Sequence, residues 1–173
     1  MKEAYKYKEQ ETVFTEDELR DNLSESELNN KGSKISESWI YKLFIKSAYK
    51  VLHKPLTVFR ILKKAVARLQ KYGSVSAFAQ DAIERTQTII RLIQAYVKGE
   101  YRYVSLFNIA LSLAGILYFL SPLDLIPDFL AFGLLDDLAL LTWIYNNLKE
   151  EIERFQQWED DQLIRVNIKQ IES

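Results

Sequence analysis

A stretch of 21 residues without a charge, Tyr103 to Leu123, constrains the fold of this chain more than any other feature. A helix needs about 20 apolar residues to cross a bilayer, so the run is long enough to span a membrane. The same run is also suited to be the buried central helix of a bundle, because amphipathic segments are available upstream to cover it. The run alone is therefore compatible with a membrane helix and with a soluble bundle.

Two prolines and two aspartates at the end of this run and just after it predict a sharp corner. Pro122 and Pro127 cannot both lie inside one regular helix, since each removes a backbone donor and clashes with the preceding turn. Asp124 is well placed to cap the short turn that ends at Asp128. The first hydrophobic helix is therefore expected to end at this corner.

A last helix is expected after the corner, reaching about Trp158. Asp136 and Asp137 are expected in its first turn, where the helix macrodipole favours negative charge. Residues 101–160 are thus predicted to form a hydrophobic helical hairpin with a two-proline corner, and residues 161–173 to fray.

Residues 118–144 carry a specific combination of prolines and aspartates. The elements occur in the order Tyr118, Ser121-Pro122, Asp124 to Asp128, Gly133 and Asp136-Asp137. In this the segment resembles the core motif of the YkvA-like family, domain of unknown function 1232. The resemblance implies a helical hairpin, often described as membrane-associated, in a family without an established activity, and it implies no catalytic residue.

Residues 36–100 show the helical period and predict three amphipathic helices. The first precedes Pro55, which suits the first turn of the second helix, and the third runs from about Ser76 to Lys98 with Gly99 as its stop. In the first helix, Trp39 and Leu43 are expected on the apolar side, away from the lysines. Because no segment has a convincing strand pattern, the predicted fold class is all-α.

The net charge of −1 conceals a basic block between acidic ends. Residues 34–72 carry ten bases and one acid, whereas residues 103–173 carry four bases and eleven acids. Residues 1–35 are polar and mostly acidic, and are predicted to be a disordered tail. Six bases of the first two helices are expected to face anionic lipid: Lys42, Lys46, Lys50, Arg60, Lys63 and Lys64.

The aspartates of the corner also allow a second interpretation. Asp124, Asp128, Asp136 and Asp137 lie within 14 residues, and no Lys or Arg occurs between Arg102 and Lys149 to compensate their charge. A cation or proton site is the alternative to helix capping, although the spacing matches neither an EF-hand nor a di-iron motif. Capping is the favoured interpretation, so no metal is predicted.

The composition argues against an enzyme. The chain has no cysteine and one histidine, which excludes thiolate sites and multi-histidine sites, and its five glycines form no glycine-rich phosphate loop. We therefore expect a non-enzymatic, membrane-associated interaction or scaffolding module without a cofactor, with its basic region on the cytoplasmic side. The alternatives are a soluble cytoplasmic bundle with a cation-binding corner, or a nucleic-acid binder using its basic helices, which is disfavoured because no recognition motif accompanies the lysines.

Overall fold

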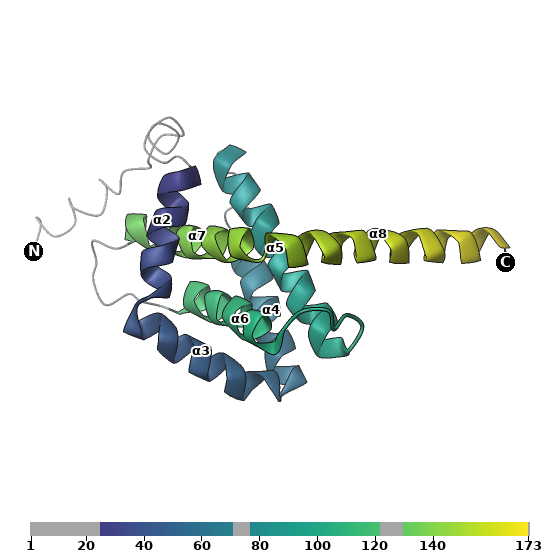
Figure 1. Cartoon of the computed structure of the whole chain (residues 1–173), viewed down its shortest axis with the longest axis horizontal. Helices are drawn as coiled ribbons and strands as arrows, with labels where there is room; N and C mark the ends of the chain where they lie inside the picture. The colour runs from purple at the N-terminus through teal and green to yellow at the C-terminus, as the bar shows by residue number, and fades with distance from the viewer. Residues whose placement is uncertain (1–24, 71–76, 122–129, 173) are drawn as a thin grey trace, which may run out of the picture.

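The computed structural model describes residues 25–70, 77–121 and 130–172. These residues form helices and contain no strand, which confirms the all-α prediction. In chain order the helices are α2 (Glu25–Ser36), α3 (Trp39–Leu52), α4 (Pro55–Gln70), α5 (Ala77–Lys98), α6 (Leu106–Leu120), α7 (Leu130–Asn147) and α8 (Lys149–Glu172) (Figure 1).

Local chemistry explains several of these boundaries. The hydroxyl of Ser38 accepts a hydrogen bond from the backbone N–H of Tyr41 (3.2 Å) and so caps the start of α3. Pro55 is the first residue of α4, where its missing donor costs nothing. Gly99 ends α5 with a φ of 80°, a left-handed conformation that glycine adopts without strain. The predicted starting proline and terminating glycine are both observed.

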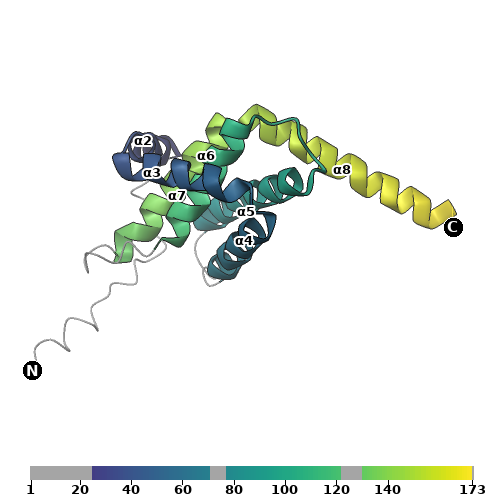
Figure 2. The same cartoon turned by 90° about the horizontal axis from the view of Figure 1, so that it is seen from below.

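Helix α6 lies at the centre of the bundle. It lies among α3, α5 and α7 (Figure 2) and also contacts α4. Most of its residues are buried. Side chains on all sides of the helix are covered, including those of Ile109, Leu113, Ile116 and Phe119, which are fully enclosed. A helix that is apolar all round requires such a cover, and the amphipathic faces of its neighbours provide it.

The charge-free run does not form one long helix. Its helical part, α6, has 15 residues, because Ser105 caps its start and the helix ends before Ser121. About 20 residues are needed to cross a bilayer. In the described parts of the chain, no helix combines the length and hydrophobicity required for a membrane span.

The helix α2 corrects the prediction of a disordered tail over residues 1–35. Residues 1–24 lie outside the described part, but residues 25–36 are helical. Leu28 is fully buried, and Gly32 lies so close to α7 that an added Cβ would overlap the backbone carbonyl of Ala139. This tertiary packing, which the local sequence does not reveal, stabilises the helix.

The last predicted helix is in fact two helices, and their ends differ from the prediction. Helix α7 ends at Asn147, whose side-chain amide donates to the carbonyl of Trp143 (2.8 Å) and competes with the helical backbone pattern. Helix α8 then continues to Glu172, so residues 161–172 are helical and not frayed. No Gly or Pro interrupts this segment, which explains why the helix persists.

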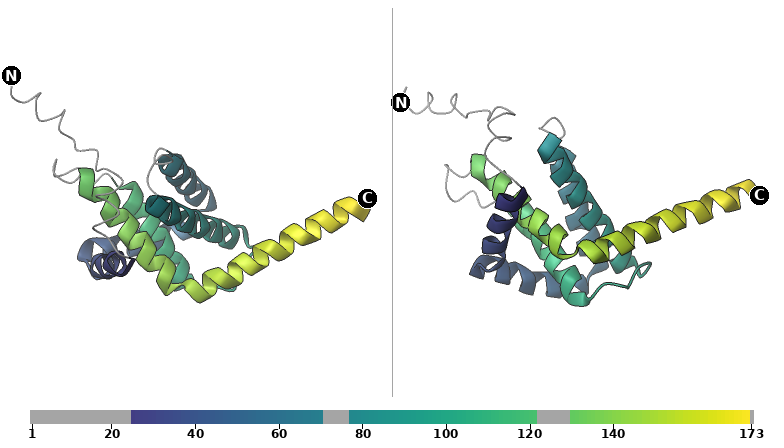
Figure 3. Two further views of the ribbon diagram at one scale, coloured as in Figure 1. Left: turned by 90° about the horizontal axis from the view of Figure 1, so that it is seen from above. Right: turned by 45° about the horizontal axis from the view of Figure 1, so that its top comes forward.

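Helix α8 leaves the bundle. Its first turns pack against the core through Ile152 and Phe155, whereas the following turns project into solvent (Figure 3). Tyr101 and Trp158 complete an aromatic cluster with Phe155 at the point where α8 departs, with ring centroids 5.2–5.8 Å apart. The bundle therefore ends at this aromatic cluster, and the C-terminal part of α8 stands alone.

Candidate functional site

Most of the predicted corner lies outside the described residues. This applies to Pro122, Asp124, Pro127 and Asp128. Asp136 belongs to α7, but its side chain is not among those described. Asp137 is therefore the one corner aspartate whose side-chain surroundings the structure describes.

The two aspartates do not lie in a first helical turn, which corrects their predicted role as caps. Helix α7 begins at Leu130, so Asp136 and Asp137 follow almost two turns later. The orphan backbone donors of a helix are confined to its first turn, so neither position can cap α7. The apolar residues before the aspartates extend the helix toward its N-terminus and displace them into its interior.

Arg68 of α4 meets Asp137 at the end of α6. One guanidinium nitrogen, Nη1, donates to the carbonyl oxygen of Phe119 (2.5 Å), and Nη2 lies 3.8 Å from Oδ2 of Asp137. The guanidinium carbon also lies 4.8 Å from the centroid of the Phe119 ring. A cation at a helix C-terminus is favoured by the macrodipole, and Asp137, only 7% exposed, gains a compensating charge. We call Arg68, Phe119 and Asp137 the arginine corner.

The arginine corner could not be recognised from the spacing of charges in the sequence. Arg68 precedes Asp137 by 69 residues and lies in the basic block, far from the aspartates. The absence of a base between Arg102 and Lys149 thus says nothing about compensation in the folded chain. Among the described residues, no group of acidic, histidine or cysteine side chains is arranged to hold a metal ion.

Helices α6 and α7 run antiparallel, as a hairpin requires. Near the start of α6, the amide of Asn108 donates to Glu151 at the beginning of α8 (3.1 Å). In the middle, Gly115 faces Ile144, and an added Cβ would overlap the tip of that side chain. The end of α6 lies near Asp137 through the arginine corner. Residues late in α6 thus meet residues early in α7.

Helix α3 covers one side of this hairpin, and the contact involves Tyr41 of α3 and Tyr118 of α6. The hydroxyl of Tyr41 donates to the carbonyl of Leu111 in α6 (2.7 Å), and burial raises the pKa of Tyr41 well above its usual range. The ring of Tyr118, the first residue of the motif, meets the rings of Tyr41 and Phe44 edge to face at 6.5 and 5.8 Å. Tyr118 is therefore part of the core contact between α3 and α6.

The exposed side of α3 combines bases with large apolar side chains. Lys42, Lys46 and Lys50 are exposed there, together with Trp39 (71% exposed) and Leu43 (50% exposed). At 3.6 residues per turn, these five positions fall within an arc of roughly 100°. The expectation that Trp39 and Leu43 lie on the apolar side, away from the lysines, is wrong, because α3 turns a different side, with Tyr41 and Ala48, toward α6.

Helix α4 also exposes bases together with an apolar side chain. Arg60, Lys63 and Lys64 are exposed, and Leu56 near the start of the helix is 75% exposed. No acidic residue occurs between Ser38 and Gln70. We call the exposed sides of α3 and α4 the basic surface: Trp39, Lys42, Leu43, Lys46, Lys50, Leu56, Arg60, Lys63 and Lys64. None of its six bases forms an ion pair within residues 25–70, 77–121 and 130–172.

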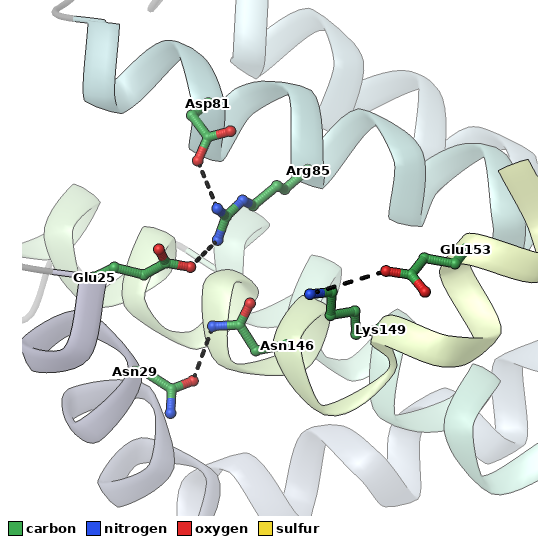
Figure 4. A network of polar contacts seen from close by, with 7 residues as sticks. All are labelled: Glu25, Asn29, Asp81, Arg85, Asn146, Lys149 and Glu153. Atoms are coloured by element: carbon green, nitrogen blue, oxygen red, sulfur yellow. Dashed lines mark hydrogen bonds and ion pairs between the residues drawn. The ribbon is translucent and has the colours of Figure 1, made fainter.

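A second group of polar contacts joins α2 to α5 and α7 (Figure 4). Arg85 of α5 forms ion pairs with Glu25 of α2 and with Asp81, both at 2.9 Å. The side chains of Asn29 and Asn146 bond across α2 and α7 at 3.2 Å. Arg85 is thus paired with two carboxylates, and these polar contacts help to hold α2 against α5 and α7.

Comparisons with known proteins find a family model and a relative that match this chain. A family model described as "Protein of unknown function (DUF1232)" matches residues 108–143. The protein named "Uncharacterized membrane protein YkvA" of Bacillus subtilis (strain 168) is 32% identical over 77 residues, which cover 44% of this chain and 73% of that protein. No solved structure matches the chain.

Proposed function

Because this chain belongs to the YkvA-like DUF1232 family, we propose that it is a non-enzymatic interaction module that binds anionic membranes through its basic surface. The relative from Bacillus subtilis is named a membrane protein, which supports a membrane-associated role. The observation that carries the proposal is the exposed side of α3, where Trp39 and Leu43 lie among three lysines.

Each part of that side suits a lipid headgroup region. Lysines near an anionic bilayer contribute about 1 kcal/mol each, and their long stems can lie along apolar groups while the ammonium reaches phosphate. Tryptophan is enriched at membrane interfaces, because its ring is apolar and its N–H is polar. An exposed Trp and Leu within an arc of lysines therefore match a surface that inserts shallowly and is held by charge.

The binding proposed here is peripheral. Most apolar side chains of α6 are buried in the bundle that α6 forms with α3, α4, α5 and α7, and only Leu106 and Phe107 in its first turn are exposed. The basic surface combines exposed apolar side chains with bases, so it is the part of the described chain that best suits an anionic bilayer. Since the cytoplasmic leaflet carries the anionic lipids, the basic surface would face the cytoplasmic side of the membrane.

Co-sedimentation with vesicles tests this proposal. The protein should pellet with phosphatidylcholine vesicles that contain phosphatidylglycerol, and not with vesicles of phosphatidylcholine alone. Replacing Lys42, Lys46 and Lys50 by Gln should weaken binding about 100-fold, if each lysine contributes about 1 kcal/mol. The matched control K34Q/K98Q/K149Q removes the same charge from other exposed positions and should bind nearly as the parent does.

Replacement of an exposed apolar side chain distinguishes lipid from nucleic acid as the ligand. Trp39→Ala should weaken vesicle binding about tenfold, because an inserted ring is lost. The proposal fails if neutral and anionic vesicles pellet the protein equally, or if neither does. It also fails if short duplex DNA competes fully for the lysines while Trp39→Ala leaves vesicle binding unchanged.

A further inference from the structure

We propose that the projecting half of α8 pairs in parallel with α8 of a second copy of this chain. The proposal is independent of membrane binding and rests on different residues. It begins from the exposure of aliphatic side chains on a helix that has left the bundle (Figure 3). Five of them are about half exposed or more: Leu163 (64%), Ile164 (56%), Val166 (52%), Ile168 (48%) and Ile171 (84%).

Three of these residues form a seam. Ile164, Ile168 and Ile171 are separated by four and three residues, which is the spacing of the contact positions of a coiled coil. At 3.6 residues per turn, this seam lies about 150° around α8 from Ile152 and Phe155, which pack into the bundle. The seam therefore points away from the body, and a second α8 can approach it without meeting the bundle of its own chain.

The charges beside the seam favour a second copy of this chain as the binding partner, with the two helices parallel. In the register of the seam, Asp160 and Arg165 lie on opposite flanks and are five residues apart. In a parallel pair, these are the positions that meet across the interface, so Asp160 of each copy faces Arg165 of the other. Neither side chain forms an ion pair within the described parts of the chain.

The excess of acidic residues in this part of α8 disfavours an anionic membrane as the binding partner. Residues 159–172 contain four acids against two bases, Arg165 and Lys169. An interfacial helix on anionic lipid is typically rich in Lys and Arg on its polar face. The C-terminal half of α8 is thus unlike the basic surface in charge, and it suits a self-complementary protein contact.

Sedimentation velocity of the full chain over roughly 1–200 μM tests the pairing. Because the seam is short, we expect a dimer with a dissociation constant on the order of 10 μM. I164S/I168S should remain monomeric throughout this range. The matched control L163S/V166S removes two equally exposed aliphatic residues outside the seam and should dimerise as the parent does. A monomeric parent, a mass of three or more chains, or equal loss in both variants would overturn the proposal.

Exchange of the flanking charges tests the register. Arg165→Asp places like charges opposite each other and should weaken the dimer about tenfold, and Asp160→Arg should do the same. The double variant D160R/R165D restores opposite charges and should recover dimerisation. Failure of this recovery, with helicity by circular dichroism unchanged, contradicts the proposed contact.

The direction can be tested by cross-linking, since the chain contains no cysteine. Ile171→Cys brings two thiols together in a parallel pair, so mild oxidation should give a disulfide-linked dimer in high yield. Val166→Cys lies outside the seam and should cross-link only slowly. Equal rates for the two variants would exclude the parallel arrangement.

Discussion

Arg68 joins three helices through one guanidinium group. It extends from α4, bonds the last turn of α6 at the Phe119 carbonyl, and lies beside Asp137 of α7. Removing one partner of a buried ion pair costs more than the pair itself contributes, because the remaining charge loses its compensation. Within the arginine corner, Asp137 therefore helps to hold the hairpin against α4.

Arg68→Met should destabilise the protein by about 2–3 kcal/mol, less than for a fully buried pair because Arg68 is partly exposed. Urea unfolding followed by circular dichroism measures this change. Asp137→Asn in the same background should cost less than in the parent, because the two side chains interact. If the two substitutions were strictly additive, the ion pair would contribute nothing to stability.

The buried hydroxyl of Tyr41 predicts how stability depends on pH. Burial raises the pKa of Tyr41 in the folded state, whereas the unfolded side chain titrates near 10. The contribution of the protonated Tyr41 hydroxyl to the free energy of unfolding is present below about pH 10. It is lost as the pH rises further, because only the unfolded state releases the proton.

Tyr41→Phe should cost about 1 kcal/mol at neutral pH, through loss of the hydrogen bond to Leu111. Between about pH 9 and pH 11 the parent should lose about 1 kcal/mol more than the variant. Urea midpoints of both proteins across this range provide the measurement. Parallel decline of the two proteins would show that Tyr41 ionises as easily in the folded state as in the unfolded one.

At the scale of elements, two glycines allow close helix packing, but their neighbours differ. A Cβ on Gly32 of α2 would overlap the backbone of Ala139, whereas one on Gly115 of α6 would meet the end of the Ile144 side chain. A side-chain tip can move by a rotamer change, but the backbone of α7 cannot move without shifting the helix.

Gly32→Ala should therefore destabilise the protein by about 1–3 kcal/mol. Gly115→Ala should change stability by less than about 1 kcal/mol, because the gain in helix propensity offsets the displacement of Ile144. Thermal melts of the two variants provide the comparison. The reverse order would mean that α2 can shift along α7 at little cost.

The elements that sequence reasoning recovered are those with local signals. Pro55 and Gly99 act on their own backbone, so the boundaries of α4 and α5 could be predicted closely. Helix α2 could not, because its order depends on the burial of Leu28 and on the contact of Gly32 with α7, over 100 residues away. The arginine corner was missed for the same reason, and the orientation of Trp39 depends on how α3 packs against α6.

At the scale of the whole molecule, the two proposed surfaces are separate. The basic surface lies on α3 and α4, whereas the seam lies on the part of α8 that projects from the bundle (Figure 1). A dimer through α8 would carry two basic surfaces. If both can reach one bilayer, the second binding step becomes intramolecular and the overall affinity rises without new contacts.

Loss of the seam should then weaken membrane binding indirectly. I164S/I168S should bind anionic vesicles at least about tenfold more weakly than the parent at concentrations where the parent is dimeric. At concentrations well below the dimer dissociation constant, the two proteins should bind equally. Vesicle titrations at the two protein concentrations distinguish this effect from a direct contact of α8 with lipid, which would persist on dilution.

The contact between α2 and α7 has a consequence for the order of assembly. Helix α2 is synthesised before the surface it covers, around Ala139 and Trp143, which follows more than 100 residues later in the chain. Contacts between such distant segments form late, because a long loop must close first. The earliest of the described helices to leave the ribosome must wait for one of the last before it can dock.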